Sequence, residues 1–247
     1  MDFNSFFKKF QENEWLYESS IIVMASLFMG LILALKVEWP IVSIEAIDFF
    51  WMFLLSLLMF FIFIGAQKLV AFYLDCKTKT KLISFRRYLF RALSEHGKAE
   101  LPFEFPAWLI LPLLLALINF KWLAIFNFDV EPKPSHVRRR WSNITESDVG
   151  KIAIAGPFAI IVLGIIFKIF AANNIAFLCM WFSFLALIPI CMGFKLLNST
   201  RVLWFFAFVF SVALLLLINL TSAFAIIVMA VILAAFATIV YYVLYER

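Results

Sequence analysis

The residues that can do chemistry inside a membrane are almost absent from the apolar stretches of this chain. No Asp, Glu or His occurs within the long apolar stretches, and four lysines enter or border them: Lys68, Lys121, Lys168 and Lys195. Proton relays, ion sites and metal centres in membranes need carboxylates, imidazoles or thiolates held inside a helix bundle. An ammonium group cannot coordinate a cation, because it has no lone pair. The pattern argues against an active enzyme.

The composition is that of an integral membrane protein. Of 247 residues, 65% are hydrophobic and 15% are charged, whereas a soluble domain is about half apolar and about a quarter charged. The net charge of +5 is concentrated in two loops, which suits anionic lipid headgroups. No basic stripe with exposed aromatic residues, typical of nucleic-acid-binding domains, is present. We predict a multi-pass protein of the cell membrane with lipids as partners and no nucleic acid.

Seven apolar stretches approach the roughly 20 residues that a membrane helix requires. They cover residues 21–35, 49–74, 107–128, 152–172, 175–197, 202–220 and 223–245. Short polar turns separate the last four stretches, so neighbouring helices there run antiparallel. The sequence therefore predicts an all-α fold, a polytopic bundle of six or seven transmembrane helices that forms one integral membrane domain over residues 1–247.

Three polar segments interrupt this pattern. Residues 1–20 carry phenylalanines at helical spacing and are expected to form an amphipathic segment on the membrane surface or a short helix docked on the bundle. Residues 75–106 and 130–151 form basic loops. A crossing by residues 107–128 places these loops on opposite sides, against the positive-inside rule. Since 22 residues are long enough to cross, we favour a true span and keep a re-entrant hairpin as the alternative.

Three short segments stand out within the apolar stretches. The first is Gly-Lys-Ile-Ala-Ile-Ala-Gly-Pro, which ends in the packing motif Ala155, Gly156 and Pro157. Its glycine allows another backbone to approach closely, and a proline near a helix start costs little. The second is the run Lys-Leu-Val-Ala at 68–71, and the third is Ala-Leu-Ile-Pro at 186–189.

In this order, the three segments resemble the site-2 protease family of intramembrane zinc metalloproteases, over roughly residues 49–206. In that family, a helix with H-E-x-x-H continues into a Lys-Leu-Val-Ala-like run, and a segment ending in Ala-Gly-Pro opens a later helix. A third helix carries N-x-x-P followed by an Asp-Gly pair. The resemblance implies that the middle of the chain has the site-2 protease core fold, in which a groove between helices can hold a substrate helix.

The ligand positions of the family are replaced in this chain. Alignment on residues 68–71 places the H-E-x-x-H positions at Phe63, Ile64 and Gln67. In such a motif, two histidines bind zinc and the glutamate is the general base. Phenylalanine and isoleucine can do neither, and a lone amide oxygen is a poor zinc ligand.

The third segment departs in the same way. It keeps Pro189, but Ala186 stands at the asparagine position, and the aspartate position falls on Phe194, or on Gly193 after a one-residue deletion. The resemblance therefore implies a degenerate, inactive homologue, a pseudoprotease without zinc or another cofactor. Five residues are expected to line the former site by packing alone: Phe63, Ile64, Gln67, Pro189 and Phe194.

We expect a non-enzymatic protein that binds or regulates other membrane proteins, including their transmembrane segments. One alternative is an active intramembrane metalloprotease with unorthodox ligands, which would have to recruit His96 and His136 from the loops. Another is a small transporter or channel subunit, for which only lysines are available as ionisable groups in the apolar stretches.

Overall fold

The computed structural model describes residues 14–38, 41–43, 45–87, 100–132, 145–189, 192–218 and 222–245. The chain is mostly helical, and four helices are long and apolar enough to cross a membrane: Leu16–Ala34, Ala46–Tyr73, Glu146–Ile169 and Phe224–Val243. A helical membrane protein is therefore the right class. Three further apolar helices have fewer than 18 residues: Ala107–Leu117, Asn173–Leu187 and Arg201–Leu217.

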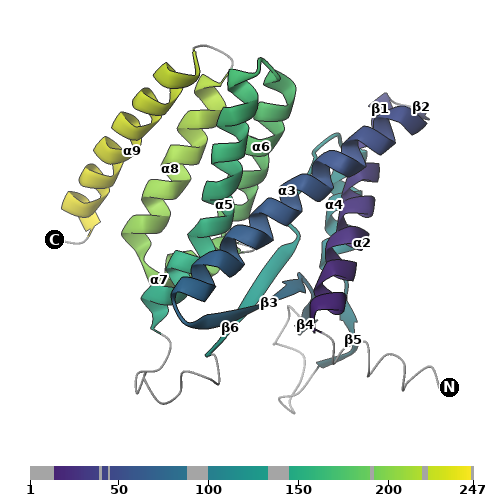
Figure 1. Cartoon of the computed structure of the whole chain (residues 1–247), viewed down its shortest axis with the longest axis horizontal. Coiled ribbons are helices and arrows are strands. Elements are labelled where there is room, and N and C mark those ends of the chain that lie inside the picture. The colour runs from purple at the N-terminus through teal and green to yellow at the C-terminus, as the bar shows by residue number, and fades with distance from the viewer. Residues whose placement is uncertain are drawn as a thin grey trace.

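Short strands lie between the helices up to residue 132, and helices alone follow from α5 to α9 (Figure 1). The helices are α2 (Glu14–Ala34), α3 (Ala46–Tyr73), α4 (Ala107–Leu117), α5 (Glu146–Ile169), α6 (Asn173–Leu187), α7 (Met192–Ser199), α8 (Arg201–Leu217) and α9 (Ala223–Tyr245). The strands are β1 (Lys36–Glu38), β2 (Ile41–Ser43), β3 (Cys76–Leu82), β4 (Phe85–Arg87), β5 (Glu100–Phe105) and β6 (Phe126–Pro132).

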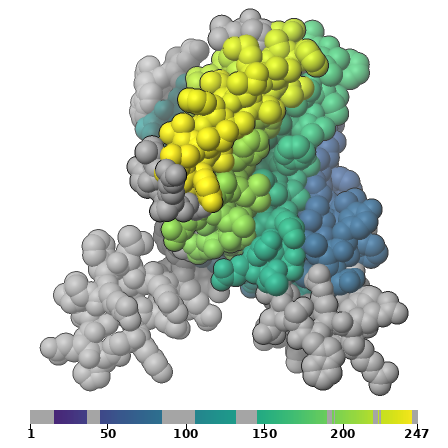
Figure 2. Space-filling view, turned by 90° about the vertical axis from the view of Figure 1, so that its left-hand side faces the viewer, coloured from purple at the N-terminus to yellow at the C-terminus, as the bar shows by residue number. Residues whose placement is uncertain are grey.

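The long helices pack in a continuous series. α2 packs on α3, α3 crosses to α5, and α5, α6, α8 and α9 follow as neighbours. Figure 2 shows α9 lying over α8 on the outer face of the bundle. The turn from α5 to α6 includes Ala171 in the left-handed region, with φ 60°, which reverses the chain within three residues. Because the turn is this short, α6 must return alongside α5.

The first helix begins earlier than the apolar pattern predicted. α2 starts at Glu14 rather than at residue 21, so residues 14–20 of the predicted amphipathic segment belong to a membrane helix, and residues 1–13 lie outside the described residues. Glu18 therefore sits on α2, and only 9% of it is exposed. Glu18 lies outside the predicted apolar stretch 21–35 but inside the helix, because α2 extends seven residues further toward the N-terminus.

Residues 107–128 do not form a span. α4 has 11 residues and rises about 16 Å, roughly half the hydrocarbon thickness. Asn119, at φ 61°, turns the chain, and residues 121–125 return without helical structure. Both ends of the hairpin meet at Ile83, which donates its N–H to Ile125 O at 3.0 Å and accepts from Trp108 N at 2.9 Å. The chain thus forms a hairpin here instead of the continuous helix that a crossing predicts, which fits the re-entrant alternative.

Protein covers the returning backbone, as non-helical structure at membrane depth requires. All five residues at 122–126 are buried. Trp181 Nε1 donates to Lys121 O at 2.8 Å, and Trp122 Nε1 donates to Ala124 O at 2.8 Å. The Lys121 ammonium donates to Leu33 O, the orphan carbonyl at the end of α2, at 2.7 Å.

The first basic loop begins and ends in strands and the second begins in one, and an all-α fold does not include such paired strands. β3 and β6 form an antiparallel ribbon in which Thr80 is paired with Phe128, and β4 pairs with β5. Charged side chains cover the outer edges of the ribbon. Glu18 Oε1 accepts from Thr80 N at 3.1 Å, and Lys195 Nζ donates to Phe128 O. The ribbon is thereby held between α2 and α7.

The predicted fifth span is also interrupted. α6 ends at Leu187, and α7 begins at Met192. A Cβ atom on Gly193 would lie 2.0 Å from Leu187 O, so only glycine permits this close return of the chain. Gly193 thus has a clear backbone role.

The hairpin makes a direct prediction about membrane topology. In a cysteine-free background, single cysteines at Lys77 and Glu131 should react with a membrane-impermeant maleimide from the same side of sealed vesicles, because these residues are paired across the ribbon. A cysteine at Lys36, beyond the other end of α2, should react only from the opposite side. Labelling of Glu131→Cys together with Lys36→Cys would show that residues 107–128 cross the membrane after all.

Candidate functional site

α3 carries the positions that correspond to the H-E-x-x-H motif, and they face two directions. Phe63 and Gln67 point into the bundle and are 1% and 2% exposed. The Phe63 ring lies 5.1 Å from the Phe182 ring of α6, centroid to centroid. Phe60, one turn earlier, contacts Phe182 and also Phe126 of β6. The inner face of α3 is therefore an aromatic packing surface.

The packing motif of α5 meets this surface directly. A Cβ atom on Gly156 would lie 2.8 Å from Phe63 Cε2 and 3.0 Å from Gln67 Nε2. Ser183 of α6 donates to the carbonyl of Pro157 at 3.1 Å, while Ala155 is only half-buried. The structure thus brings Phe63 and Gln67 onto Gly156, and the Phe63 ring fills the space that the absent Cβ leaves.

The remaining predicted site residues lie elsewhere. Ile64 is buried but lines a groove on the other side of α3. Pro189 is exposed in the turn after α6. Phe194 belongs to α7, a helix that packs on α5 and α8. The segment at 186–189 therefore contributes a chain turn, whereas the contacts of the inner site come from Phe63, Gln67 and Gly156.

Metal ligands are a separate question. Among the residues that the structure describes, no group of three or more His, Cys, Asp or Glu side chains is placed to hold a metal ion. Cys76 and Cys179 are buried and form no disulfide. His96 and His136 lie outside the described residues. The polar side chains of the inner site are the Gln67 amide and the Ser183 hydroxyl, which donates to Pro157 O.

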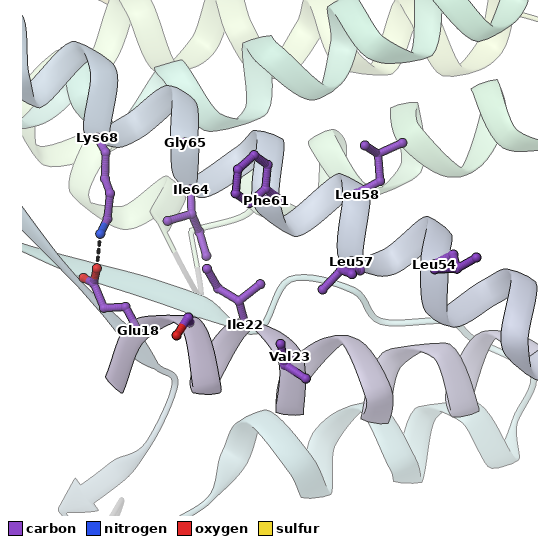
Figure 3. Close-up of a pocket in the computed structure, with 11 residues that line it drawn as sticks. Glu18, Ile22, Val23, Leu54, Leu57, Leu58, Phe61, Ile64, Gly65 and Lys68 are labelled. Atoms are coloured by element: carbon purple, nitrogen blue, oxygen red, sulfur yellow. Dashed lines mark hydrogen bonds and ion pairs between the residues drawn. The ribbon is translucent and has the colours of Figure 1, made fainter. Parts of the chain in front are cut away.

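The outer face of α3 borders a groove of about 620 Å³ between α2 and α3 (Figure 3). The two helices are in direct contact beside the groove. Ser56 Oγ of α3 donates to Ser26 O of α2 at 2.8 Å. A Cβ atom on Gly30 of α2 would lie only 2.7 Å from Phe53 Cα of α3. The groove lining is almost entirely apolar. It consists of Glu18, Ser19, Ile22, Val23, Leu54, Leu57, Leu58, Phe61, Ile64, Gly65 and Lys68.

An ion pair occupies one end of the groove, on the side of the basic loops. Lys68 of α3 reaches across to Glu18 of α2, as Figure 3 shows. The Glu18 side chain is 11% exposed and the Lys68 side chain 39%. Glu18 uses one carboxylate oxygen for Lys68 and the other for the Thr80 N–H. A buried carboxylate stripped of such partners is strongly destabilising, so this pair ties together α2, α3 and β3.

Sequence analysis missed this ion pair. The only local feature that could have indicated it is the extension of the apolar stretch of α2 back to Leu16. This extension places Glu18 inside the helix, one turn from its start. Lys68 was noted, but its partner lies 50 residues away in the chain. No periodicity or spacing connects two residues at that separation.

The two glycines of the site make a matched pair for a stability prediction. Gly156→Ala should lower the free energy of unfolding by about 1–3 kcal/mol, because the new methyl group overpacks against Phe63. Gly65→Ala should be neutral or raise it by up to about 1 kcal/mol, since no atom lies within 4 Å of its Cβ position and alanine favours helix. Thermal unfolding in detergent measures both. Adding Phe63→Leu should recover part of the Gly156→Ala loss, and equal effects of the two alanines would contradict this packing.

No protein-family model matches this chain, and neither a curated protein nor a solved structure matches it. The resemblance to the site-2 protease family therefore rests on the three sequence segments at 68–71, 150–157 and 186–189 alone.

Proposed function

We propose that this protein is a catalytically inactive, site-2-protease-like membrane protein that binds single transmembrane segments of other membrane proteins. The groove between α2 and α3 is the observation that carries this proposal. It is apolar, about 620 Å³ in volume, and borders the same helix, α3, that carries the former ligand positions.

The α3 side of the groove suits an apolar helix. Leu54, Leu58, Phe61 and Gly65 recur at intervals of four, three and four residues, which places them on one helix face. They extend over about 16 Å of the helix axis. The first three are 37%, 41% and 68% exposed, so this face has room for an additional partner.

Gly65 supports a helix as the occupant. Small residues let two membrane helices approach closely, and close approach is what stabilises helix pairs in lipid. Gly65 faces the groove, with open space where a side chain would be. A side chain of a bound helix can insert over this position, between Phe61 and Lys68.

The inner site supports binding without catalysis. Phe63 packs on Gly156 and Phe182, so the helices that hold zinc in the family are joined here by apolar contacts. A charged ligand left without metal in this interior would be costly, whereas an aromatic ring keeps the bundle closed. The proposed role is to bind, retain or chaperone a segment.

The proposal includes a topology. α2, α3, α5, α6, α8 and α9 form six spans, and α4 with the returning chain forms a re-entrant hairpin. Both basic loops then lie on one side, which the positive-inside rule identifies as cytoplasmic in a cell membrane. The ion-paired end of the groove faces that side.

Metal analysis separates this function from an active protease. We expect the purified protein to hold far less than one zinc per chain, since the residues that the structure describes include no cluster of three His, Cys, Asp or Glu side chains that could hold a metal ion. The His96→Ala/His136→Ala variant should have the same metal content by mass spectrometry. Stoichiometric zinc that is lost in this variant would overturn the proposal in favour of a protease with relocated ligands.

Photocrosslinking tests the binding function itself. With benzoylphenylalanine in place of Leu58, we expect adducts with integral membrane proteins in native membranes, and Gly65→Ile should reduce them at least fivefold by filling the groove. Leu69→Phe is the matched control, because Leu69 lies on the same helix, 57% exposed, and outside the groove lining. Adducts that persist unchanged in Gly65→Ile would exclude the groove as the binding site.

A further inference from the structure

The two walls of the groove, α2 and α3, are in close contact at one end of it and separated at the other. From this, we infer that the half of α2 nearer the β3–β6 ribbon is a hinged wall of the groove, and that the Glu18–Lys68 ion pair is a latch that limits how far this wall moves. The effect of the latch on binding rests on the proposed function, whereas the movement of the wall can be measured without any occupant.

The end of the groove away from the ribbon is closed by direct contact between the two helices. Ser56 Oγ of α3 donates to Ser26 O of α2 at 2.8 Å. Gly30 of α2 lies against Phe53 of α3, where an added Cβ atom would be 2.7 Å from Phe53 Cα. A lysine of the re-entrant hairpin also donates a hydrogen bond to the last turn of α2. This end of α2 is therefore fixed, and it forms the hinge.

The half of α2 that borders the groove is packed far less than the half at the hinge. Two of the nine residues at 16–24 are buried, Glu18 and Ile21, against seven of the ten residues at 25–34. Val23, which lines the groove, is 48% exposed. In lipid, helices associate through packing and hydrogen bonds, without a hydrophobic driving force. A half with so little packing depends on its polar contacts for its position.

The ion pair bridges the gap at the wide end of the groove. Figure 1 shows α2 and α3 diverging toward the ribbon, and Figure 3 shows Lys68 extended across the groove to Glu18. The second carboxylate oxygen of Glu18 accepts the Thr80 N–H at 3.1 Å, which fixes α2 to β3 as well. The pair is net neutral, so it provides a link between the two walls rather than a charge for an occupant.

The distance between latch and hinge determines how large the movement is. Glu18 precedes Gly30 by twelve positions on α2, which is about 18 Å along the helix axis. A rotation of about 10° at the hinge would therefore move Glu18 by about 3 Å, which separates it from Lys68. Because helices in contact lie about 8–10 Å apart, a change of this size decides whether a side chain of an occupant fits between the walls.

Pulsed electron paramagnetic resonance measures this movement on the full chain in phosphatidylcholine vesicles. In a cysteine-free background, spin labels at Leu16→Cys and Leu69→Cys report the wide end of the groove. Labels at Leu27→Cys and Trp51→Cys report the hinge. All four side chains are exposed, at 46%, 57%, 52% and 64% in that order, and none of them lines the groove, so the labels leave it open.

The Glu18→Gln/Lys68→Met variant releases the latch. It removes both charges together and leaves no buried charge without a partner, while the new amide can still accept the Thr80 N–H. We expect the mean distance of the wide-end pair to rise by about 3 Å and its distribution to broaden, with the hinge pair unchanged. Lys68→Arg keeps the ion pair and should leave both distances as in the wild type.

A second variant, Glu18→Leu/Lys68→Met, also removes the acceptor for Thr80 and should widen the groove further. No widening in Glu18→Gln/Lys68→Met, or an equal change in both label pairs, would overturn the latch. Widening in the second variant alone would assign the hold on α2 to the Thr80 hydrogen bond and would overturn it as well. Thermal unfolding in detergent checks that each variant is folded, and Glu18→Gln/Lys68→Met decides if the second variant is not.

Photocrosslinking then connects the latch to the proposed function. The probe is a biotinylated Leu/Ala peptide of about 24 residues, long enough to span the membrane, and the protein carries benzoylphenylalanine at Leu58. Release of the latch should raise the initial crosslinking rate at least threefold, because the wall opens without breaking an ion pair. Widening with an unchanged rate would exclude the latch as a regulator of binding.

The two measurements fail separately. If the labels show a wider groove but the peptide crosslinks to neither protein, the proposed function fails and the hinge stands. If the peptide crosslinks equally to both proteins and the wide-end distance does not change, the groove binds helices and the latch is excluded.

Discussion

The hydrogen bonds that hold both ends of the re-entrant hairpin at Ile83 determine much of the rest of the structure. A backbone that enters the membrane without crossing it must find its partners in protein. In the returning chain, Lys121 O accepts from Trp181 of α6, Ala124 O from Trp122 and Ile125 O from Ile83. Because the chain returns to the side from which it entered, β6 can pair with β3. The edge of that ribbon holds Glu18, and Glu18 in turn positions Lys68 at the end of the groove.

α3 joins two faces of different character. Phe63 and Gln67 face inward, against Gly156, while Ile64 and Gly65 line the groove on the outer side. Adjacent residues of a helix lie about 100° apart around the axis, so consecutive positions can serve the core and the groove. In the site-2 protease resemblance, the inner face is the reactive one. Here, the inner face is closed by aromatic packing, and the groove lies on the outer face.

The Glu18–Lys68 ion pair lies at one end of the groove and also connects three elements of the fold. Its desolvation offsets much of its electrostatic attraction, so such a pair contributes more to specificity than to stability. In this protein it joins α2 to α3 across the groove and also fixes α2 to the ribbon. The pair therefore holds α2, α3 and β3 together at one end of the groove.

Hydropathy alone determined the class of the protein and the approximate bounds of α3, α5, α8 and α9, because a membrane helix needs a continuous apolar stretch and that property is local. The Ala-Gly-Pro motif also singled out Gly156 as a position of close approach, and in the structure Phe63 is what approaches it. The alternating Cys76–Leu82 segment was a strand signal that the basic charge concealed. Only the tertiary structure decided that residues 107–125 return rather than cross, and that Glu18 meets Lys68. Both depend on partners distant in the chain, Ile83 and Thr80 among them, and no local pattern records such pairing.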